Sequence, residues 1–565
     1  MPTPTARVHD AYRRIAEAGR PEVWITLRPE ADLLVEAKAV EDRLSAGEDL
    51  PLAGTVVAVK DNIDVAGLPT TAACPEFAYT PEASATAVQR LVEAGALVLG
   101  KTNLDQFATG LVGTRSPYGA VRNAFDPERI SGGSSSGSAV AVALGIADVA
   151  LGTDTAGSGR VPAALHGIVG IKPTLGLVPA TGVVPAARPY DCVTVFARDL
   201  ATGTAALRVM TGPDAGDPYS RDWPSDVRLA PRDPARVGVP TADGIAVLSD
   251  GERSAFDAAA DTLRAAGVEV AAVDVAPLLE AARLLYDGAL VAERYAAVGD
   301  FLAGGPESAD PTVSGIILAA AGLPAHALAA DQHRLAAYRS TARALLAGFD
   351  ALLLPTTVGH PTLAEVAADP VGENSRLGTY TNFVNLLDLA AVAVPAGTAD
   401  GHAFGVTLVS DAFDDQAGLD LAAVLTDDDP GEAYPEPGVE LAVFGAHLRG
   451  QPLNHQLTDL GARFVEETRT SADYRLFALA TTPPKPGLQR VTEAGAAVRC
   501  EVWRISPAGL GAFLAALPAP MTLGSVTLAD GRSVVGFGCQ ASAVEGAEDI
   551  SRHGGWLAYR ASLKD

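Results

Sequence analysis

Hydrophobic and polar positions alternate along the first three quarters of the chain in a way that predicts helices between short buried strands. In residues 31–44 the apolar positions recur every three or four residues, which predicts an amphipathic helix. The run TVVAVK at 55–60 follows it and predicts a buried strand. Further short apolar runs, separated by helix-like stretches, lie at 96–99, 149–151, 236–239, 350–354 and 391–394. This alternation predicts an α/β fold with a sheet covered by helices on both faces.

The pattern changes at DDDPGEAYPEPG, residues 427–438, where acidic residues, three prolines and two glycines replace the helical periodicity. We interpret this stretch as a linker between a first domain, 1–426, and a second, 439–565. Strand-like runs dominate the second part, at 441–444, 475–480, 498–505 and 533–538. The pattern predicts a smaller α+β domain after the linker. A chain of 565 residues is also long enough to need at least two domains.

The formal net charge of −26 restricts the partners. A strongly negative surface repels phosphates, so we expect neither nucleic acid nor an anionic membrane as a partner. The same field disfavours the approach of a small anion. An anionic substrate would therefore need a cation inside its pocket, and an arginine is the residue to look for.

The four cysteines lie far apart without a CxxC spacing, which argues against a zinc site, a redox motif or disulfides. We expect reduced thiols and no metal. The first residues contain no apolar stretch typical of a signal peptide, and the most apolar later stretch, 313–330, is interrupted by glycine, proline and histidine. These features predict a cytoplasmic protein.

Three segments place a reactive side chain beside unusual backbone chemistry: VAVKDNID with Lys60, SGGSSSGSA with Ser134, and GTDTAGSGR with Ser158. Burial at the end of a strand would lower the pKa of Lys60 and make its neutral amine a base. The serine-rich segment precedes an apolar helical stretch, and the Gly-Ser-Gly turn exposes a hydroxyl beside free N–H groups. Singly, each has an ordinary interpretation: a solvated lysine, a linker or phosphate-binding loop, and a common turn.

Together the three segments resemble the amidase signature family. Lys60 precedes Ser134 by 74 residues, and Ser134 precedes Ser158 by 24, in the order and approximate spacing of that family. The resemblance implies a mixed β-sheet flanked by helices, Ser158 as nucleophile, Ser134 on a cis peptide bond, Lys60 as base, and no cofactor. Ser136 stands where the family more often has glycine. The implied oxyanion hole consists of the N–H groups of Thr155, Ala156, Gly157 and Ser158.

Within that family, LLYDGALVAERYAAV at 284–298 and ATGLVGTRSPYG at 108–119 are similar to the allophanate hydrolases. The similarity implies that Tyr286 and Arg294 bind the substrate carboxylate and that Gly110 leaves room beside it. Without the similarity, Arg294 would be interpreted as a surface charge of an amphipathic helix.

The second domain contains GAHLRGQPLNHQL and CEVWRI, which resemble the C-terminal domain of allophanate hydrolases, related in shape to γ-glutamylcyclotransferases. In some members this domain decarboxylates N-carboxycarbamate with a histidine as general base. The resemblance makes His447 the candidate and His455 the alternative. It also implies allophanate as substrate, a homodimer, and a link to urea carboxylase, with cyanuric acid degradation as another possible pathway.

Two alternatives remain open at this point. The first keeps the chemistry and changes the substrate: a general amidase, or a glutaminase subunit of a tRNA-dependent amidotransferase. The second is a scaffold that binds amides or carboxylates without catalysis. Such a scaffold would retain a lysine, two serines and a glycine turn for no chemical reason.

Overall fold

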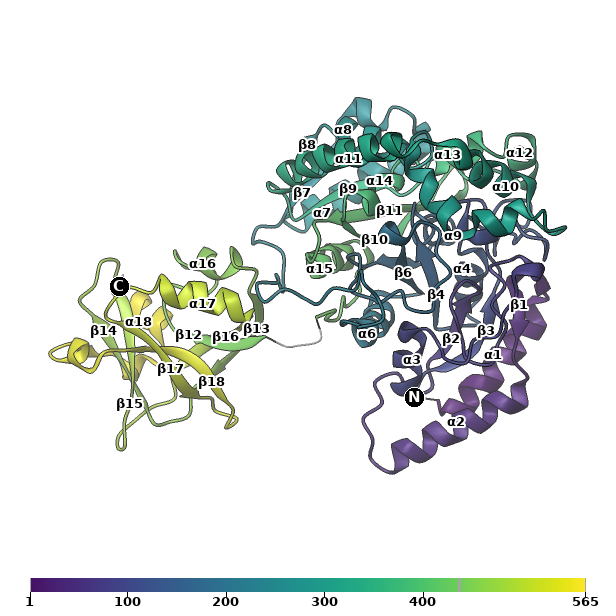
Figure 1. The fold of residues 1–565 in the computed structure, drawn as a ribbon. Coiled ribbons are helices and arrows are strands. Elements are labelled where there is room, and N and C mark those ends of the chain that lie inside the picture. The colour runs from purple at the N-terminus through teal and green to yellow at the C-terminus, as the bar shows by residue number, and fades with distance from the viewer. Residues whose placement is uncertain (1, 435–437, 564–565) are drawn as a thin grey trace. The chain divides into compact units, whose positions relative to one another are not determined.

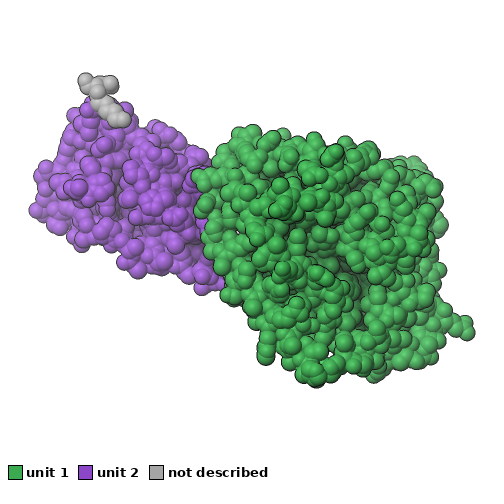
Figure 2. Space-filling view, turned by 90° about the horizontal axis from the view of Figure 1, so that it is seen from above, with its two compact units in different colours: residues 1–223, 235–435 green, residues 224–234, 436–565 purple. Residues whose placement is uncertain are grey.

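The computed structural model describes residues 2–434 and 438–563 and divides the chain into two compact units (Figure 2). Unit 1 comprises Met1–Trp223 and Ala235–Pro435, and unit 2 comprises Pro224–Pro234 and Glu436–Asp565. The chain therefore passes from one unit to the other three times. The early segment of unit 2, 224–234, was not anticipated from the sequence, because it is short and shows no change of pattern.

Unit 1 is built on one mixed sheet of eleven strands (Figure 1). Their order is β1-β3-β2-β4-β6-β5-β10-β11-β9-β7-β8. The pairs β2–β3, β2–β4, β7–β8 and β7–β9 are parallel, and the other pairs are antiparallel. The strands are β1 Trp24–Leu27, β2 Val56–Lys60, β3 Leu97–Thr102, β4 Val149–Asp154, β5 Val169–Lys172, β6 Cys192–Ala197, β7 Arg236–Pro240, β8 Glu269–Val273, β9 Ala351–Pro355, β10 Ala390–Ala399 and β11 His402–Ser410.

Helices lie on both sides of this sheet, which confirms the predicted α/β class (Figure 1). All positions of β2, β3 and β4 are buried, as expected for strands covered on both faces. The helices are α1 Pro4–Ala18, α2 Glu30–Ser45, α3 Thr86–Glu93, α4 Ser136–Ala143, α5 Val161–His166, α6 Leu200–Met210, α7 Asp250–Ala265, α8 Ala276–Arg283, α9 Ala292–Ala303, α10 Pro311–Leu318, α11 Ala325–Leu346, α12 Leu363–Ala368, α13 Gly372–Leu377, α14 Asn382–Leu386 and α15 Asp415–Thr426.

The helix α4 is one of the deeply buried helices that position the site. Seven of its eight residues are buried, because its sequence SGSAVAVA is small and apolar on every side. Its alanines and valines pack against Ala58 of β2 and Ala150 of β4. This packing fixes the loop before α4 against the ends of two central strands.

No single helix of residues 2–434 and 438–563 is long and apolar enough to cross a membrane. The stretch 311–322 and helix α11 reach that criterion only as a pair, and the pair is bent by 104°.

Unit 2 contains a five-stranded sheet in the order β13-β16-β12-β18-β17 and a three-stranded sheet, β15-β14-β19. Its strands and helices confirm the predicted α+β class. The elements are β12 Val439–Val443, α16 His455–Thr458, β13 Arg463–Arg469, β14 Tyr474–Leu479, β15 Lys485–Arg490, β16 Arg499–Ile505, α17 Pro507–Ala515, β17 Met521–Thr527, β18 Ser533–Cys539, β19 Glu548–Asp549 and α18 Trp556–Ser562.

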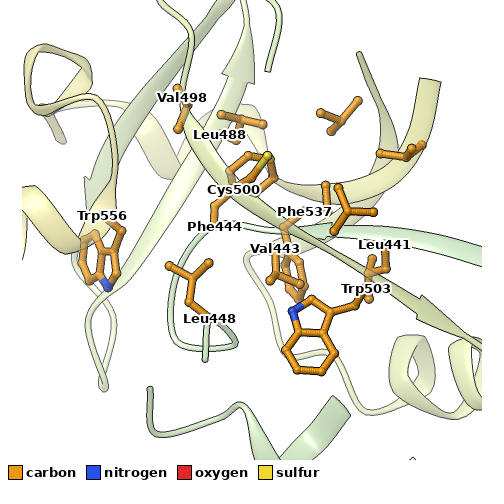
Figure 3. Close-up of a cluster of buried hydrophobic side chains, with 14 of the residues drawn as sticks. Leu441, Val443, Phe444, Leu448, Leu488, Val498, Cys500, Trp503, Phe537 and Trp556 are labelled. Atoms are coloured by element: carbon orange, nitrogen blue, oxygen red, sulfur yellow. The ribbon is translucent and has the colours of Figure 1, made fainter. Parts of the chain in front are cut away.

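A core of aliphatic and aromatic side chains holds unit 2 together (Figure 3). Phe444, Trp503 and Phe537 lie in this core together with Leu441 and Val443 of β12. Cys500 is buried there too, and all four cysteines are free thiols. Unit 2 therefore has its own hydrophobic core.

The backbone of the segment 224–234 is hydrogen-bonded to the rest of unit 2. The Leu229 N–H donates to the carbonyl oxygen of Gly461 at 2.9 Å, and Arg463 Nε donates to the Leu229 carbonyl at 2.8 Å. The Ala508 N–H donates to the Ser225 carbonyl at 2.9 Å. Unit 2 is thus completed by a stretch of chain that lies more than 200 residues before its first strand.

Candidate active site

Lys60 is the last residue of β2, and its side chain is completely buried. Its Nζ lies 2.8 Å from Ser134 Oγ and 2.8 Å from Thr153 Oγ1. Burial lowers the pKa of Lys60 to about 7, against the attraction of the Asp105, Asp154 and Asp191 carboxylates. At neutral pH a large fraction of this amine is uncharged and able to accept a proton.

Ser134 follows a cis peptide bond, Gly133–Ser134, in the loop before α4. The Asp105 N–H donates to the Ser134 carbonyl at 3.1 Å. A Cβ atom on Gly133 would lie 2.0 Å from Asp105 Oδ2, so only glycine fits at that position. Ser136 begins α4 and is not among the residues with positive φ, so the departure from the family pattern causes no strain there.

Asp105 organises the backbone opposite this loop. Its Oδ2 accepts the N–H groups of Val112 and Gly113, at 3.1 and 3.0 Å, and its Oδ1 accepts that of Arg115 at 3.0 Å. The carboxylate is fully buried. Three hydrogen bonds offset the cost of burying its charge, and they fix the loop 105–115 against the cis peptide.

Ser158 lies on the turn between β4 and α5, which a buried ion pair holds in shape. The Asp154 carboxylate accepts the N–H groups of Gly157 and Gly159, at 2.8 and 3.0 Å, and pairs with Arg160 at 2.9 Å. Gly157 has a φ of 136°, and a Cβ atom there would lie 2.4 Å from Thr381 Oγ1. The glycine therefore allows both the backbone conformation and the close approach of Thr381.

The Ser158 side chain is 3% exposed, and its hydroxyl has no hydrogen-bond partner among the residues that the structure describes. The N–H groups of Thr155, Ala156 and Ser158 likewise have no acceptor in residues 2–434 and 438–563. The Gly157 N–H does not share this property, because it donates to Asp154. Three of the four predicted oxyanion donors thus have a free N–H group among the described residues, and their role stays a prediction.

Arg294 of α9 is 2% exposed and lies beside Tyr286. Its Nη2 donates to the Tyr286 hydroxyl at 3.0 Å, and its Nη1 donates to Thr109 Oγ1 at 2.9 Å and to the Ala108 carbonyl at 3.4 Å. In the part of the chain that the structure describes, no carboxylate pairs with Arg294. A buried guanidinium without a counter-ion is costly, which points to an anionic ligand.

Gly110 lies in the same loop as Thr109, but the structure gives it a different neighbour from the one expected. A Cβ atom on Gly110 would lie 2.6 Å from Asp105 Oδ2. Its small size is thus explained by contact with a buried carboxylate of the protein. Whether Gly110 also borders a substrate stays a prediction.

A second candidate site lies in unit 2, where a cavity of about 520 Å³ is lined by His447 but not by His455. The His447 Nε2 lies 3.0 Å from Gln456 Oε1. Its ring stacks on Phe537 with centroids 4.9 Å apart. Burial lowers the pKa of His447, so the ring is neutral at pH 7. His455 is exposed and its Nδ1 lies 3.0 Å from the Pro452 carbonyl.

The family is decided by a comparison with protein-family models. Residues 7–419 match the model described as "Amidase". The chain belongs to the amidase family. Residues 439–561 match a second model, "Allophanate hydrolase C-terminal domain", which lies within unit 2.

Similar proteins agree with this division of the chain. The allophanate hydrolase of Kluyveromyces lactis has a structure with a TM-score of 0.88 and 41% identity, covering 100% of this chain and 97% of that one. A urea amidolyase from Lachancea kluyveri is 44% identical over 575 residues, 96% of this chain. The chain spans only 31% of the length of that protein. A glutamyl-tRNA(Gln) amidotransferase subunit from Halobacterium salinarum is 36% identical over 69% of this chain and 99% of its own.

Several residues that shape the site of this amidase were not selected from the sequence. Thr153 is the second acceptor of the Lys60 amine, and Thr109 holds Arg294. Asn385 donates to the carbonyl of Asp154 at 2.7 Å from a helix 231 residues further along the chain. Asp154 and Arg160 stand inside the segment GTDTAGSGR, so two charged residues in an otherwise small and polar turn were a signal that could have been used. No sequence pattern around Thr109 or Asn385 indicated a role for these two residues.

Proposed function

We propose that unit 1 hydrolyses allophanate, the carboxylate of urea, to ammonia and N-carboxycarbamate. The observation that best supports this substrate is the burial of Arg294, which has no carboxylate partner among the described residues. Its guanidinium donates hydrogen bonds to the hydroxyl groups of Tyr286 and Thr109. A planar guanidinium pairs with a carboxylate through two parallel hydrogen bonds, so it supplies both charge and orientation. The similarity to the allophanate hydrolase of Kluyveromyces lactis supports the same substrate.

The proposed reaction uses Ser158 as nucleophile, Ser134 as proton relay and Lys60 as base. The neutral Lys60 amine accepts the Ser134 proton over the 2.8 Å hydrogen bond, and Ser134 accepts that of Ser158. The Ser158 oxygen attacks the terminal amide carbon of allophanate. The protons return through Ser134 to the leaving nitrogen, which departs as ammonia, and water then hydrolyses the acyl-enzyme by the same relay.

The developing negative oxygen needs hydrogen-bond donors that are already in place. We assign this role to the N–H groups of Thr155, Ala156 and Ser158, which have no acceptor within the described residues. One such donor contributes about 3 to 4 kcal/mol to the transition state in comparable sites. The Asp154–Arg160 ion pair holds these amides in position, so that no reorganisation is needed during the reaction.

For unit 2 we propose a second step, the decarboxylation of N-carboxycarbamate, with His447 as general base. The match to the allophanate hydrolase C-terminal domain and the position of a neutral His447 on a cavity support this assignment. His455 remains the alternative, although it lies outside the cavity lining.

A general amidase or a glutaminase subunit is the second candidate for unit 1, because the glutamyl-tRNA(Gln) amidotransferase relatives match over about 70% of the chain. The Lachancea kluyveri urea amidolyase matches over 96%, including unit 2, and this favours allophanate. Ammonia release from allophanate and from glutamine, measured side by side, separates the two. Rapid release from glutamine without turnover of allophanate would reject our proposal.

A scaffold that binds amides without catalysis predicts a different result for Ser158. We expect Ser158→Ala to abolish ammonia release while leaving the melting temperature within about 1 °C of the wild type. Ser135→Ala is the matched control, because Ser135 neighbours the proposed relay but hydrogen-bonds to the Thr153 carbonyl instead. Full turnover by Ser158→Ala would show that this hydroxyl is not the nucleophile.

We also propose that the protein works in the cytoplasm as a homodimer. A functional link to urea carboxylase, which makes allophanate from urea, is supported by the urea amidolyase relatives. Sedimentation of the purified chain tests the dimer. A single species at the monomer mass of 57.7 kDa would contradict it.

A further inference from the structure

The cavity of unit 2 is apolar over most of its wall. Among the described residues that line it, the polar side chains are those of His447, Gln456, Thr482 and Lys485, and there is no aspartate or glutamate. The remaining lining residues are aliphatic, aromatic, glycine or proline. A charged ligand in this cavity would therefore depend on Lys485 for electrostatic compensation.

Lys485 is the first residue of β15 and directly follows the turn that joins β14 to β15. Within residues 2–434 and 438–563 its ammonium makes no ion pair and no hydrogen bond. The exposed Arg490 at the other end of the same strand does, because it pairs with Asp473 at 2.8 Å. Lys485 is thus a cation that lines an apolar cavity and has no counter-ion among the described residues of unit 2.

The choice of lysine at this position is unusual for this chain. It contains 36 arginines and only six lysines. Lys60, Lys101 and Lys172 are completely buried. Of these, Lys60 belongs to the proposed relay, and Lys101 pairs with the buried Asp61 at 3.1 Å. Lys38 of α2, by contrast, is exposed and pairs with Glu41 and Asp42. A lysine ammonium is a compact charge with three donors, suited to a small carboxylate in a narrow space.

The His447 ring lies on the same cavity. Its orientation is fixed by stacking on Phe537, by an edge contact with Phe513 at 5.2 Å, and by Gln456. If Nε2 carries the proton that Gln456 Oε1 accepts, the other ring nitrogen, Nδ1, is a free acceptor. The charge of Lys485 lies close enough to lower the pKa of His447 further. The two side chains thus combine a neutral base with a cation.

We propose that Lys485 binds a carboxylate of a small dianion in the cavity of unit 2 and positions that dianion against the His447 ring. The proposal deepens the second step of the proposed function, in which N-carboxycarbamate is the dianion. In that step one C–N bond breaks, its electron pair stays on nitrogen, and CO₂ leaves. The nitrogen then receives a proton that the His447 ring has accepted from solvent, which completes carbamate. Lys485 holds the carboxylate that carbamate keeps, while the carboxylate that is lost faces the apolar wall.

The binding claim is tested with malonate, in which a CH₂ group replaces the N–H group between the two carboxylates. The full chain is labelled at histidine Cε1, and the His447 signal is assigned with His447→Gln. We expect malonate to shift that signal saturably, and Lys485→Met to weaken the binding about ten- to one-hundred-fold. Lys485→Arg, which keeps the charge on a larger group, should weaken the binding less than Lys485→Met does. Arg490→Met, the control on the same strand, should retain the full affinity.

A His447 signal that does not respond to malonate in the wild type would overturn the proposal. An unchanged affinity in Lys485→Met would overturn it as well, provided that the variant keeps the wild-type melting temperature. Should Lys485→Met fail to fold, Lys485→Gln, which keeps a polar end without the charge, replaces it in the same titration.

Turnover separates this proposal from the function on which it rests. With ¹³C-allophanate, Lys485→Met should release ammonia from unit 1 at the wild-type rate and accumulate the carboxylated intermediate, with a raised KM for its decay. If malonate binds in a Lys485-dependent way but the intermediate decays equally fast in wild type and His447→Gln, the anion site stands and the decarboxylase assignment fails. Equal KM values in wild type and Lys485→Met, with a slower decay in His447→Gln, would instead reject Lys485 alone.

Discussion

Burial of Lys60 should make this residue a base at the expense of stability, and Lys60→Met tests both effects. In the unfolded chain the pKa of Lys60 is about 10.5, and in the fold it is lowered to about 7, chiefly by burial. A difference of this size corresponds to about 5 kcal/mol between the two protonation states. Under the proposed mechanism, the chain keeps a lysine that opposes folding because the reaction needs its neutral form.

The sign of the pH dependence follows from the two pKa values. Between pH 7 and 10.5 the unfolded chain holds the Lys60 proton and the folded chain does not. The loss of folding stability caused by burying Lys60 is therefore greatest at and below pH 7 and decreases toward pH 10.5. At pH 7, Lys60→Met removes this destabilisation and so increases the free energy of unfolding by about 4 kcal/mol. It also removes the donor to Ser134 and Thr153, at a cost of about 1 kcal/mol each.

We therefore expect Lys60→Met to be more stable than the wild type by about 2 kcal/mol at pH 7, and slightly less stable at pH 10. For a unit of this size, the gain at pH 7 raises the melting temperature by about 2 °C. Differential scanning calorimetry at both pH values measures the change. The control is Lys101→Met, which leaves the buried Asp61 carboxylate unpaired and should cost about 3 to 5 kcal/mol at both.

Activity gives the second half of the test. In the wild type, kcat/KM for ammonia release should rise with pH around a midpoint near 7 and level off above pH 8, because only the neutral amine accepts a proton. Lys60→Met should lose about two to four orders of magnitude. A variant less stable than the wild type at pH 7, or a rate that does not change between pH 6 and 8, would refute the reasoning.

Three further predictions concern other parts of the molecule. Arg294→Met should raise KM for allophanate about ten- to one-hundred-fold, because the guanidinium faces no other carboxylate in the described chain. It should change turnover of biuret, in which an amide replaces the carboxylate, far less. Equal losses on both substrates would contradict carboxylate binding by Arg294. His166 is buried with both ring nitrogens engaged and a pKa lowered to about 4, so it stays neutral in the fold, and the stability it contributes is lost as the pH falls from 6.5 to 4. Between pH 6.5 and 4 the loss of folding stability is about 3 kcal/mol. His166→Gln, which keeps a donor and an acceptor, should make the melting temperature fall less steeply as the pH is lowered. The same slope in both proteins would show that other groups control the pH dependence. Removal of 436–565 should give an aggregating protein, since 224–234 then loses its hydrogen-bond partners. Replacing 224–234 by a glycine-serine linker in the same truncation should restore a monodisperse unit 1 in size-exclusion chromatography. If the truncation without the linker is already monodisperse, the segment does not need the rest of unit 2.

The sequence alone predicted several of the strands, the helix at 31–44 and three segments expected to carry chemistry, but it did not single out strands such as β1 and β8. Local periodicity predicts the buried strand that ends at Lys60, and the helix predicted at 31–44 is α2, Glu30–Ser45. Such patterns are local, because a helix or a strand covered on both faces repeats its apolar positions within a few residues. The change of composition at 427–438 predicts a linker between two domains, and the larger part of unit 2 comprises Glu436–Asp565.

Only the tertiary structure decided what each reactive residue faces. Lys60 and Ser134, which are hydrogen-bonded, lie 74 residues apart in the sequence. Arg294 and Thr109, which are hydrogen-bonded too, lie 185 residues apart. Contacts at such separations depend on the packing of the whole sheet and its helices, and no local pattern records them. The same holds for the absence of a carboxylate beside Arg294 and Lys485 in the described chain. Burial and missing counter-ions exist only in three dimensions, and the proposed roles of Lys60 as a base and of Arg294 and Lys485 as binding residues rest on them.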